Sequence, residues 1–176
     1  MGDLARLGKT LPVLLFPLAA MQTVAAQEWH TYAYPADGFS IAAPAEPVAS
    51  RQAVSGEEGT VQMHNYLLDL GTAALYASTS DNAMVPGANA DEALKGAEQG
   101  AVQNFHGRLV SDRRIVLSSY PGIEMEADSD SAHFTARIYI VRSRLYLTLV
   151  VSAPGRPYAD AERFLDSFRL LPAVSN

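Results

Sequence analysis

The chain of 176 residues contains no cysteine. This absence excludes disulfide bonds, thiolate metal sites, a cysteine nucleophile and the anchor cysteine of a lipoprotein. Charged residues make up 18% of the chain, an ordinary share, but basic residues are few, so the formal net charge is −6. Nucleic acids and anionic membranes require a basic face on the proteins that bind them, so neither is expected as a partner.

Signatures of catalysis are missing as well. The sequence contains no Gly-x-Ser-x-Gly, Ser-x-x-Lys, Gly-x-x-x-x-Gly-Lys or Gly-x-Gly-x-x-Gly pattern, and thus no recognisable nucleophile elbow or phosphate-binding loop. The histidines also lack the spacing of a metal pair within one helix or strand. They are His30, His64, His106 and His133. We therefore predict that the protein is not an enzyme and holds neither a cofactor nor a metal.

Four acidic residues recur at alternate positions late in the chain: Glu124, Glu126, Asp128 and Asp130. On a strand the first three would share one face, where their oxygens could hold a hard cation. The same pattern is typical of a solvated strand face, for which Arg114 and Arg137 would be charge partners. The stretch also lacks the glycine of a calcium loop. A cation-binding or hydrolytic role for this strand is the alternative to a pure binding function.

The first 26 residues are predicted to be a secretory signal peptide. Arg6 and Lys9 precede the apolar run Leu11–Ala20, which is too short to span a bilayer, since a spanning helix needs ~20 apolar residues. Val24-Ala25-Ala26 then supplies the small residues that precede a cleavage site, ahead of Gln27.

Cleavage at this site would leave a single domain, residues 27–176, in the periplasm or outside the cell. The mature protein would have no stable membrane insertion. Its net charge would change from −6 to −7, because the segment removed contains two basic residues and the acidic Asp3.

The strongest structural pattern is a hairpin formed by His133–Val141 and Arg144–Ser152 around a turn at Arg142-Ser143. Both arms alternate between two sets of side chains, as strands do. A two-residue turn sets Ile138 opposite Leu147, and a one-residue slip would mix the faces. Because both faces are apolar, we predict that the hairpin lies in the middle of a sheet covered on both sides.

Shorter alternating segments predict further antiparallel strands: Phe39–Ala43, Val48–Val54, Thr60–Asp69, Ala73–Ser80, Arg108–Ser118 and Ile123–Asp128. We expect a three-residue loop, Tyr120–Gly122, between the last two. This loop pairs Leu117 with Ile123 and brings Arg114 to the face of Glu124.

Two helices are predicted. The first is capped by Asn89, carries an apolar stripe that includes Leu94, and ends at Gly107. Gly96 and Gly100 are expected to flatten the face of this helix that lies on the sheet. The second helix carries its stripe from Tyr158 to Phe168 and stops at Pro172. The fold class is therefore α+β, with an antiparallel sheet sandwiched between helices.

Taken together, these segments resemble the PsbP/Mog1-type fold. The matching residues are Trp29, Tyr32, Gly38–Ile41, Pro44, Pro47, Gly107–Val110, Tyr120–Glu124, the central hairpin and Ala161–Phe168. Members include photosystem-associated lumenal proteins, a nuclear transport factor and many exported bacterial proteins. The resemblance implies α/β/α layers and a non-catalytic protein that binds other proteins. It transfers no functional residue, because the family has no shared catalytic set.

A candidate binding patch follows from the order of the strands. If they run up and down in sequence, the turns that hold Tyr120, Arg142 and Arg144 fall at the same end of the sheet. Tyrosine and arginine are favoured at binding hot spots, and a basic spot on an acidic protein would steer it toward an acidic partner. We therefore predict an accessory module that binds an unknown protein through these residues. A small-ligand carrier, with its site between the sheet and a helix, is a further alternative.

Overall fold

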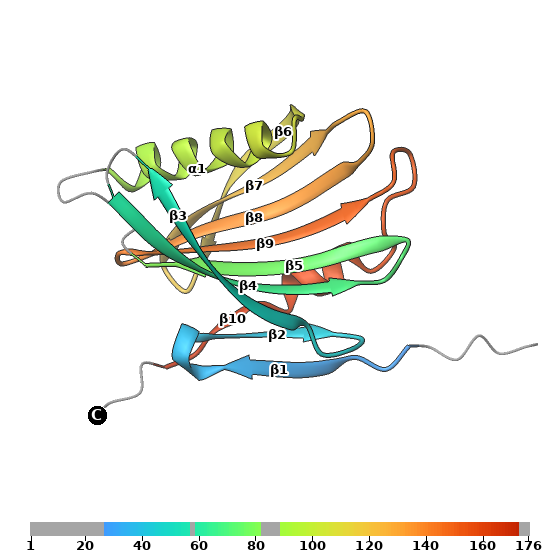
Figure 1. Ribbon diagram of the computed structural model, residues 1–176, viewed down its shortest axis with the longest axis horizontal. Coiled ribbons are helices and arrows are strands. Elements are labelled where there is room, and N and C mark those ends of the chain that lie inside the picture. The colour runs from blue at the N-terminus through green and yellow to red at the C-terminus, as the bar shows by residue number, and fades with distance from the viewer. Residues whose placement is uncertain (1–26, 57–58, 82–88, 173–176) are drawn as a thin grey trace, which may run out of the picture.

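The computed structural model describes residues 27–56, 59–81 and 89–172 (Figure 1). They form a seven-stranded antiparallel sheet in the order β3-β4-β5-β9-β8-β7-β6 and a three-stranded sheet in the order β1-β2-β10. The strands are β1 His30–Tyr34, β2 Phe39–Ala43, β3 Val48–Gly56, β4 Gly59–Asp69, β5 Ala73–Ser80, β6 Arg108–Leu117, β7 Tyr120–Asp128, β8 His133–Val141, β9 Arg144–Ser152 and β10 Arg169–Leu170. The helices are the 3-10 turn η1 Pro35–Asp37, α1 Ala90–Asn104 and α2 Ala161–Asp166.

The predicted signal peptide, residues 1–26, lies outside the described residues. Among the helices that are described, none combines the length and the apolar character needed to cross a membrane.

The prediction for the central hairpin is confirmed. β9 is the middle strand of the large sheet and β8 is its neighbour. Their register sets Ile138 opposite Leu147 and Tyr139 opposite Tyr146. A separate apolar cluster packs on each face of the hairpin, one containing Ile138 and the other containing Tyr139.

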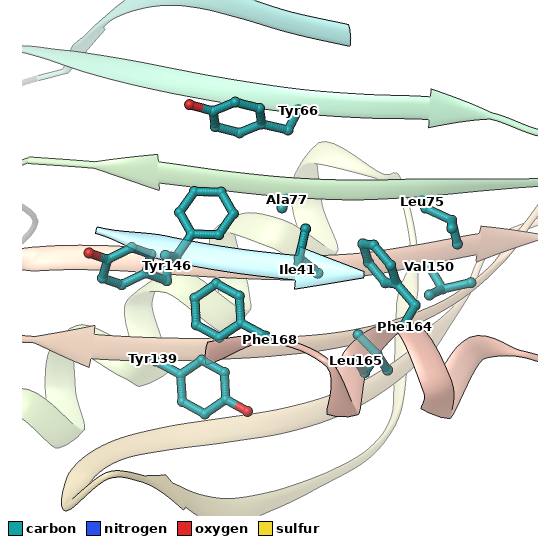
Figure 2. Packing of buried hydrophobic residues seen from close by; sticks show 11 residues of the cluster. Ile41, Tyr66, Leu75, Ala77, Tyr139, Tyr146, Val150, Phe164, Leu165 and Phe168 are labelled. Atoms are coloured by element: carbon teal, nitrogen blue, oxygen red, sulfur yellow. The ribbon is translucent and has the colours of Figure 1, made fainter. Parts of the chain in front are cut away.

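The two faces of the large sheet are covered by different kinds of structure. On one face α1 packs against β7 and β8 around Leu94 and Phe134. The other face is covered by the three-stranded sheet together with α2, through Ile41, Phe164 and Phe168 (Figures 1 and 2). The predicted antiparallel α+β architecture is thus present, but layering between helices is not confirmed, since strands form much of the second cover.

The second helix is shorter than predicted. It begins at Ala161 rather than Tyr158 and ends at Asp166, so Phe168 lies beyond it. Arg169–Leu170 then pairs with β2, and the Leu171 backbone N–H donates to the Gly38 carbonyl at 2.8 Å. Because this pairing satisfies the open edge of β2, the chain leaves the helical conformation before Pro172 is reached.

The predicted loop between β6 and β7 is wrong. The strands are joined by a two-residue turn at Ser118 and Ser119, both with positive φ (49° and 75°), and Leu117 lies opposite Tyr120. Pairing with Ile123 was expected because it keeps Leu117 away from the acidic face. That face is not acidic along its whole length, however. Its first half lies against the aromatic cluster around Tyr139, and Leu117 packs there.

This register makes Gly122 a position where a side chain has no room. Gly122 lies opposite Tyr139, and an added Cβ would be 2.5 Å from Tyr139 Cδ1 and 2.8 Å from the Ile138 carbonyl oxygen. We expect Gly122→Ala to lower the free energy of unfolding by about 1–3 kcal/mol, the usual cost of overpacking. Urea unfolding would measure this loss, and an unchanged midpoint would contradict the register.

Helix α1 confirms its predicted start, because the Asn89 side chain accepts a hydrogen bond from the Asp91 backbone N–H at 3.0 Å. At the other end His106, with φ 49°, takes the left-handed conformation, and the Gly107 N–H donates to the Val102 carbonyl at 2.9 Å. The glycine that closes the helix thus lies one residue beyond the left-handed position.

The expectation that two glycines flatten the buried face of α1 is also wrong. A Cβ added at Gly96 or Gly100 would have no atom within 4 Å, so neither glycine lies at the contact with the sheet. Leu94 is buried there instead, with Ala97 packed beside it.

Gly96→Ala and Gly100→Ala should therefore each stabilise the protein. Alanine is favoured over glycine in a helix interior by about 1 kcal/mol, and here it meets no neighbour. Urea unfolding should show a gain for each variant and an additive gain for the pair. A loss of stability in either variant would mean that this face of α1 is covered.

Candidate functional site

The structure brings the three predicted patch residues to one end of the molecule. The end of β5 and the turn between β8 and β9 lie at this end, on the left in Figure 1. Five segments meet there: η1, the end of β5, the β6–β7 turn, the β8–β9 turn and the residues around the end of β10. Between them lies a hollow of about 870 Å³, called here the end hollow. Tyr120, Arg142 and Arg144 all line it.

Arg144 is committed to a contact within the chain. Its Nε donates to Asp81 Oδ1 at 2.5 Å, and its side chain is 28% exposed. This hydrogen bond to Asp81 raises the pKa of the guanidinium further above its ordinary value. Because a carboxylate of the same chain already balances its charge, Arg144 forms part of the wall rather than an available cation.

Arg142 and Tyr120 are placed differently. Arg142 lies exposed in the β8–β9 turn with φ 60° and makes no ion pair with any described residue. Tyr120 begins β7 and is half-buried. The walls beside them include Val141 and Leu170, which are apolar. The end hollow therefore combines one uncompensated cation, a phenol and apolar surface, which suits a carboxylate attached to an apolar group.

A buried polar cluster behind the end hollow was not predicted from the sequence. Asp37, in η1, is only 3% exposed. One of its carboxylate oxygens lies 2.6 Å from His64 Nδ1, and the other accepts a hydrogen bond from the Tyr66 hydroxyl. The Tyr146 hydroxyl donates to the Asp37 backbone oxygen at 2.9 Å.

This cluster fixes η1 on the large sheet. Burial and the hydrogen bond to Asp37 raise the pKa of Tyr66 above its ordinary value of 10.0, so the phenol stays protonated and continues to donate. The sequence contains one signal of this cluster: His64 and Tyr66 are two residues apart, so their side chains lie on the same face of β4. No signal in the sequence indicates that Asp37 is buried in this cluster, since Asp37-Gly38 is typical of an ordinary turn.

The acidic strand is engaged by arginines rather than open to a cation. Glu124 accepts from Arg113 Nε and from Arg137 Nε, each at 2.7 Å. The predicted partner Arg137 is therefore correct. Arg114, however, lies on the other face and pairs with Asp91 at 3.1 Å.

Further along the acidic strand, Asp128 lies 2.7 Å from His133 Nδ1. Within the described ranges, no group of three or more His, Asp or Glu side chains is placed to hold a metal ion. The described residues of the acidic strand therefore supply no set of ligands for the alternative cation-binding role.

The chain was compared with known families, sequences and structures. No protein-family model matches it, and no curated protein sequence does. The solution structure of cyanobacterial PsbP (CyanoP) from Synechocystis sp. PCC 6803 superimposes with a TM-score of 0.55 at 15% identity, covering 88% of this chain and 99% of that one. A Pseudomonas aeruginosa protein of unknown function, PA94, gives a TM-score of 0.35 at 10% identity, covering 72% of this chain and 83% of that one. The CyanoP match shows that the chain has a PsbP-like fold.

Proposed function

We propose that the protein is an exported, non-catalytic accessory module that binds another protein at the end hollow. The observation that carries this proposal is Arg142, an exposed cation without an ion-pair partner among the described residues, at the edge of a hollow of about 870 Å³. The likeness to CyanoP supports an accessory role. Binding residues also concentrate on turns held by a rigid scaffold; Arg142 lies in such a turn, and Tyr120 directly follows another.

The partner chemistry follows from the charges. The protein carries a net charge of −6, so an exposed arginine in this setting would steer an acidic group toward the end hollow. The apolar walls would then accept the group that bears the carboxylate. A protein partner with an acidic, partly apolar loop or terminus fits both features.

Site-directed photo-crosslinking in the producing cells tests this proposal. A photoreactive amino acid at Ser143, an exposed residue of the end hollow next to Arg142, should capture one partner protein, whereas the same amino acid at Asp130, an exposed turn residue at the opposite end, should not. The variant Tyr120→Ala with Arg142→Asn should reduce capture by about tenfold or more. Equal capture from both positions would contradict the proposal.

The choice of Arg142→Asn keeps the fold out of the result. Asparagine tolerates positive φ, so the turn at φ 60° is retained while the charge is removed. Arg144→Glu is unsuitable, because it would set a second carboxylate against Asp81. An unchanged melting temperature of the double variant would show that lost capture reflects lost contacts.

Export and the small-ligand alternative have separate measurements. If the protein is exported and cleaved, its intact mass should equal that of a chain beginning at Gln27. A mass that includes residues 1–26 would contradict this prediction. Native mass spectrometry of the freshly purified protein would reveal a co-purified small molecule, for which the volume of the end hollow is sufficient. Such a molecule would favour a carrier over a protein-binding module.

A further inference from the structure

β3 and β6 are the two edge strands of the seven-stranded sheet (Figure 1). An edge strand presents unpaired backbone N–H and C=O groups along its outer side, and proteins commonly obstruct such edges with charges, prolines or bulges. β6 is obstructed in this way. It carries Arg108, Asp112, Arg113 and Arg114, and its register shifts between Leu109 and Ser111.

β3 has no comparable obstruction. Every side chain from Val48 to Val54 is exposed, and Arg51 is the only charged one among them. The register with β4 is continuous from the Val48–Leu67 pair to the Gly56–Gly59 pair, without a bulge. Within the described part of the chain, β4 is the only strand that pairs with β3. The outer side of β3 can therefore hydrogen-bond a further strand along its length.

The side chains around this edge indicate which strand would fit. On the α1 side of the sheet, beyond the part that α1 covers, three apolar residues are exposed: Val48 at 72%, Leu67 at 45% and Val54 at 40%. On the opposite face of β3 lie Ala49, Arg51 and Ala53. A strand added beside β3 would direct alternate side chains to these two rows.

We propose that β3 is a docking edge for an extended segment of a partner protein, with apolar residues at alternate positions and a carboxylate opposite Arg51. Main-chain hydrogen bonds would supply affinity, and the alternating side chains would supply register. Charge complementarity identifies the acidic position, because Arg51 makes no ion pair with a described residue. The docking edge shares no residue with the end hollow, so it does not depend on the function proposed for that site.

A second copy of the chain fits this edge less well. The symmetric antiparallel pairing that sets Val48 against Val54 would place the two Arg51 side chains directly opposite each other. Like charges directly opposite on neighbouring strands are destabilising. The edge is therefore suited to a segment with a different sequence.

The probe is a short capped peptide in which valine alternates with threonine and a central glutamate replaces one threonine. Titrated into the full chain, it should shift the backbone amide signals of β3 and β4 and leave those of β6 in place. Replacing the glutamate of the peptide by lysine should weaken binding by about tenfold or more. Absence of shifts in β3 at millimolar peptide would overturn the proposal.

Two variants localise the effect. Arg51→Glu should weaken peptide binding by about tenfold, whereas Arg108→Glu, the same change on an exposed arginine of the other edge, should alter it less than about twofold. Equal effects of the two changes would show that the peptide responds to net charge alone. Sedimentation of the protein with and without peptide is the remaining check, since a dimer that the peptide dissociates would assign β3 to self-association instead.

Discussion

Replacement of Phe168 by alanine is expected to destabilise the protein by about 3–5 kcal/mol, the range for removing a buried phenylalanine. The side chain is 2% exposed. Its ring stacks on Phe39 of the small sheet with 5.4 Å between centroids, and on Tyr139 of the large sheet at 5.8 Å. Figure 2 shows Phe168 beside Tyr139 and Tyr146. One side chain thus joins the two sheets, and its loss would leave a cavity between them.

Urea unfolding at low temperature would measure the loss, with Phe105→Ala as the matched control. Phe105 is partly buried and stacks on Phe134 at 4.5 Å, on the other face of the large sheet. Its removal should cost less, because water can reach the space that it leaves. An equal or smaller loss for Phe168→Ala would show that Phe168 does not join the sheets as described.

The sequence predicted the central hairpin well because its information is local. β8 and β9 alternate on both faces, so only one register keeps Ile138 opposite Leu147 and Tyr139 opposite Tyr146. The same register places Arg142 in the connecting turn. The up-and-down order of the strands then brings Tyr120 to the same end, as predicted.

Two errors arose where distant segments decide the local conformation. Phe168 continues a helical stripe that begins at Tyr158, yet pairing of Arg169–Leu170 with β2 ends the helix at Asp166. The β6–β7 turn falls on Ser118 and Ser119, which both have positive φ. Glycine and asparagine are the residues that usually indicate positive φ, and neither is present in this turn.

The end hollow was predictable only in part, for the same reason. Asp81 reaches Arg144 because β5 lies next to β9, and Asp37 reaches His64 because η1 packs on the large sheet. Neither placement has a local sequence signal. The sequence therefore does not distinguish the two arginines. In the structure Arg144 is paired with Asp81, and Arg142 is the exposed cation that a partner can reach.

Replacement of Arg137 by methionine is expected to cost about 3–5 kcal/mol at neutral pH, the usual loss when one partner of a buried ion pair is removed. The Arg137 guanidinium contacts Glu124 at 2.7 Å, Glu162 at 2.8 Å and Asp166 at 2.6 Å. It is 8% exposed and therefore fastens α2 to the large sheet from within. Methionine would fill most of the volume but leave Glu124, with a side chain only 14% exposed, without its nearest buried cation.

The control for this change is Arg114→Met. Arg114 is also a strand arginine with a carboxylate partner, but its side chain is 50% exposed. Ion pairs of this kind contribute about 0–1 kcal/mol, so the control should unfold at nearly the same urea concentration as the wild type. Similar losses for the two variants would contradict a special role for Arg137.

The pH dependence of the Arg137→Met deficit separates lost charge from lost packing. Burial alone would raise the pKa of Glu124, but its hydrogen bonds to Arg137 and Arg113 and their charges lower it below its ordinary value of 4.5. A lowered pKa in the folded protein adds stability that is present above pH 4.5 and lost as the pH falls through the lowered value. The wild type should therefore lose stability on acidification more steeply than Arg137→Met, and the gap between them should narrow from about pH 7 to about pH 3. Urea titrations at the two pH values measure that gap, and a constant gap would mean that Arg137 stabilises the fold by packing alone.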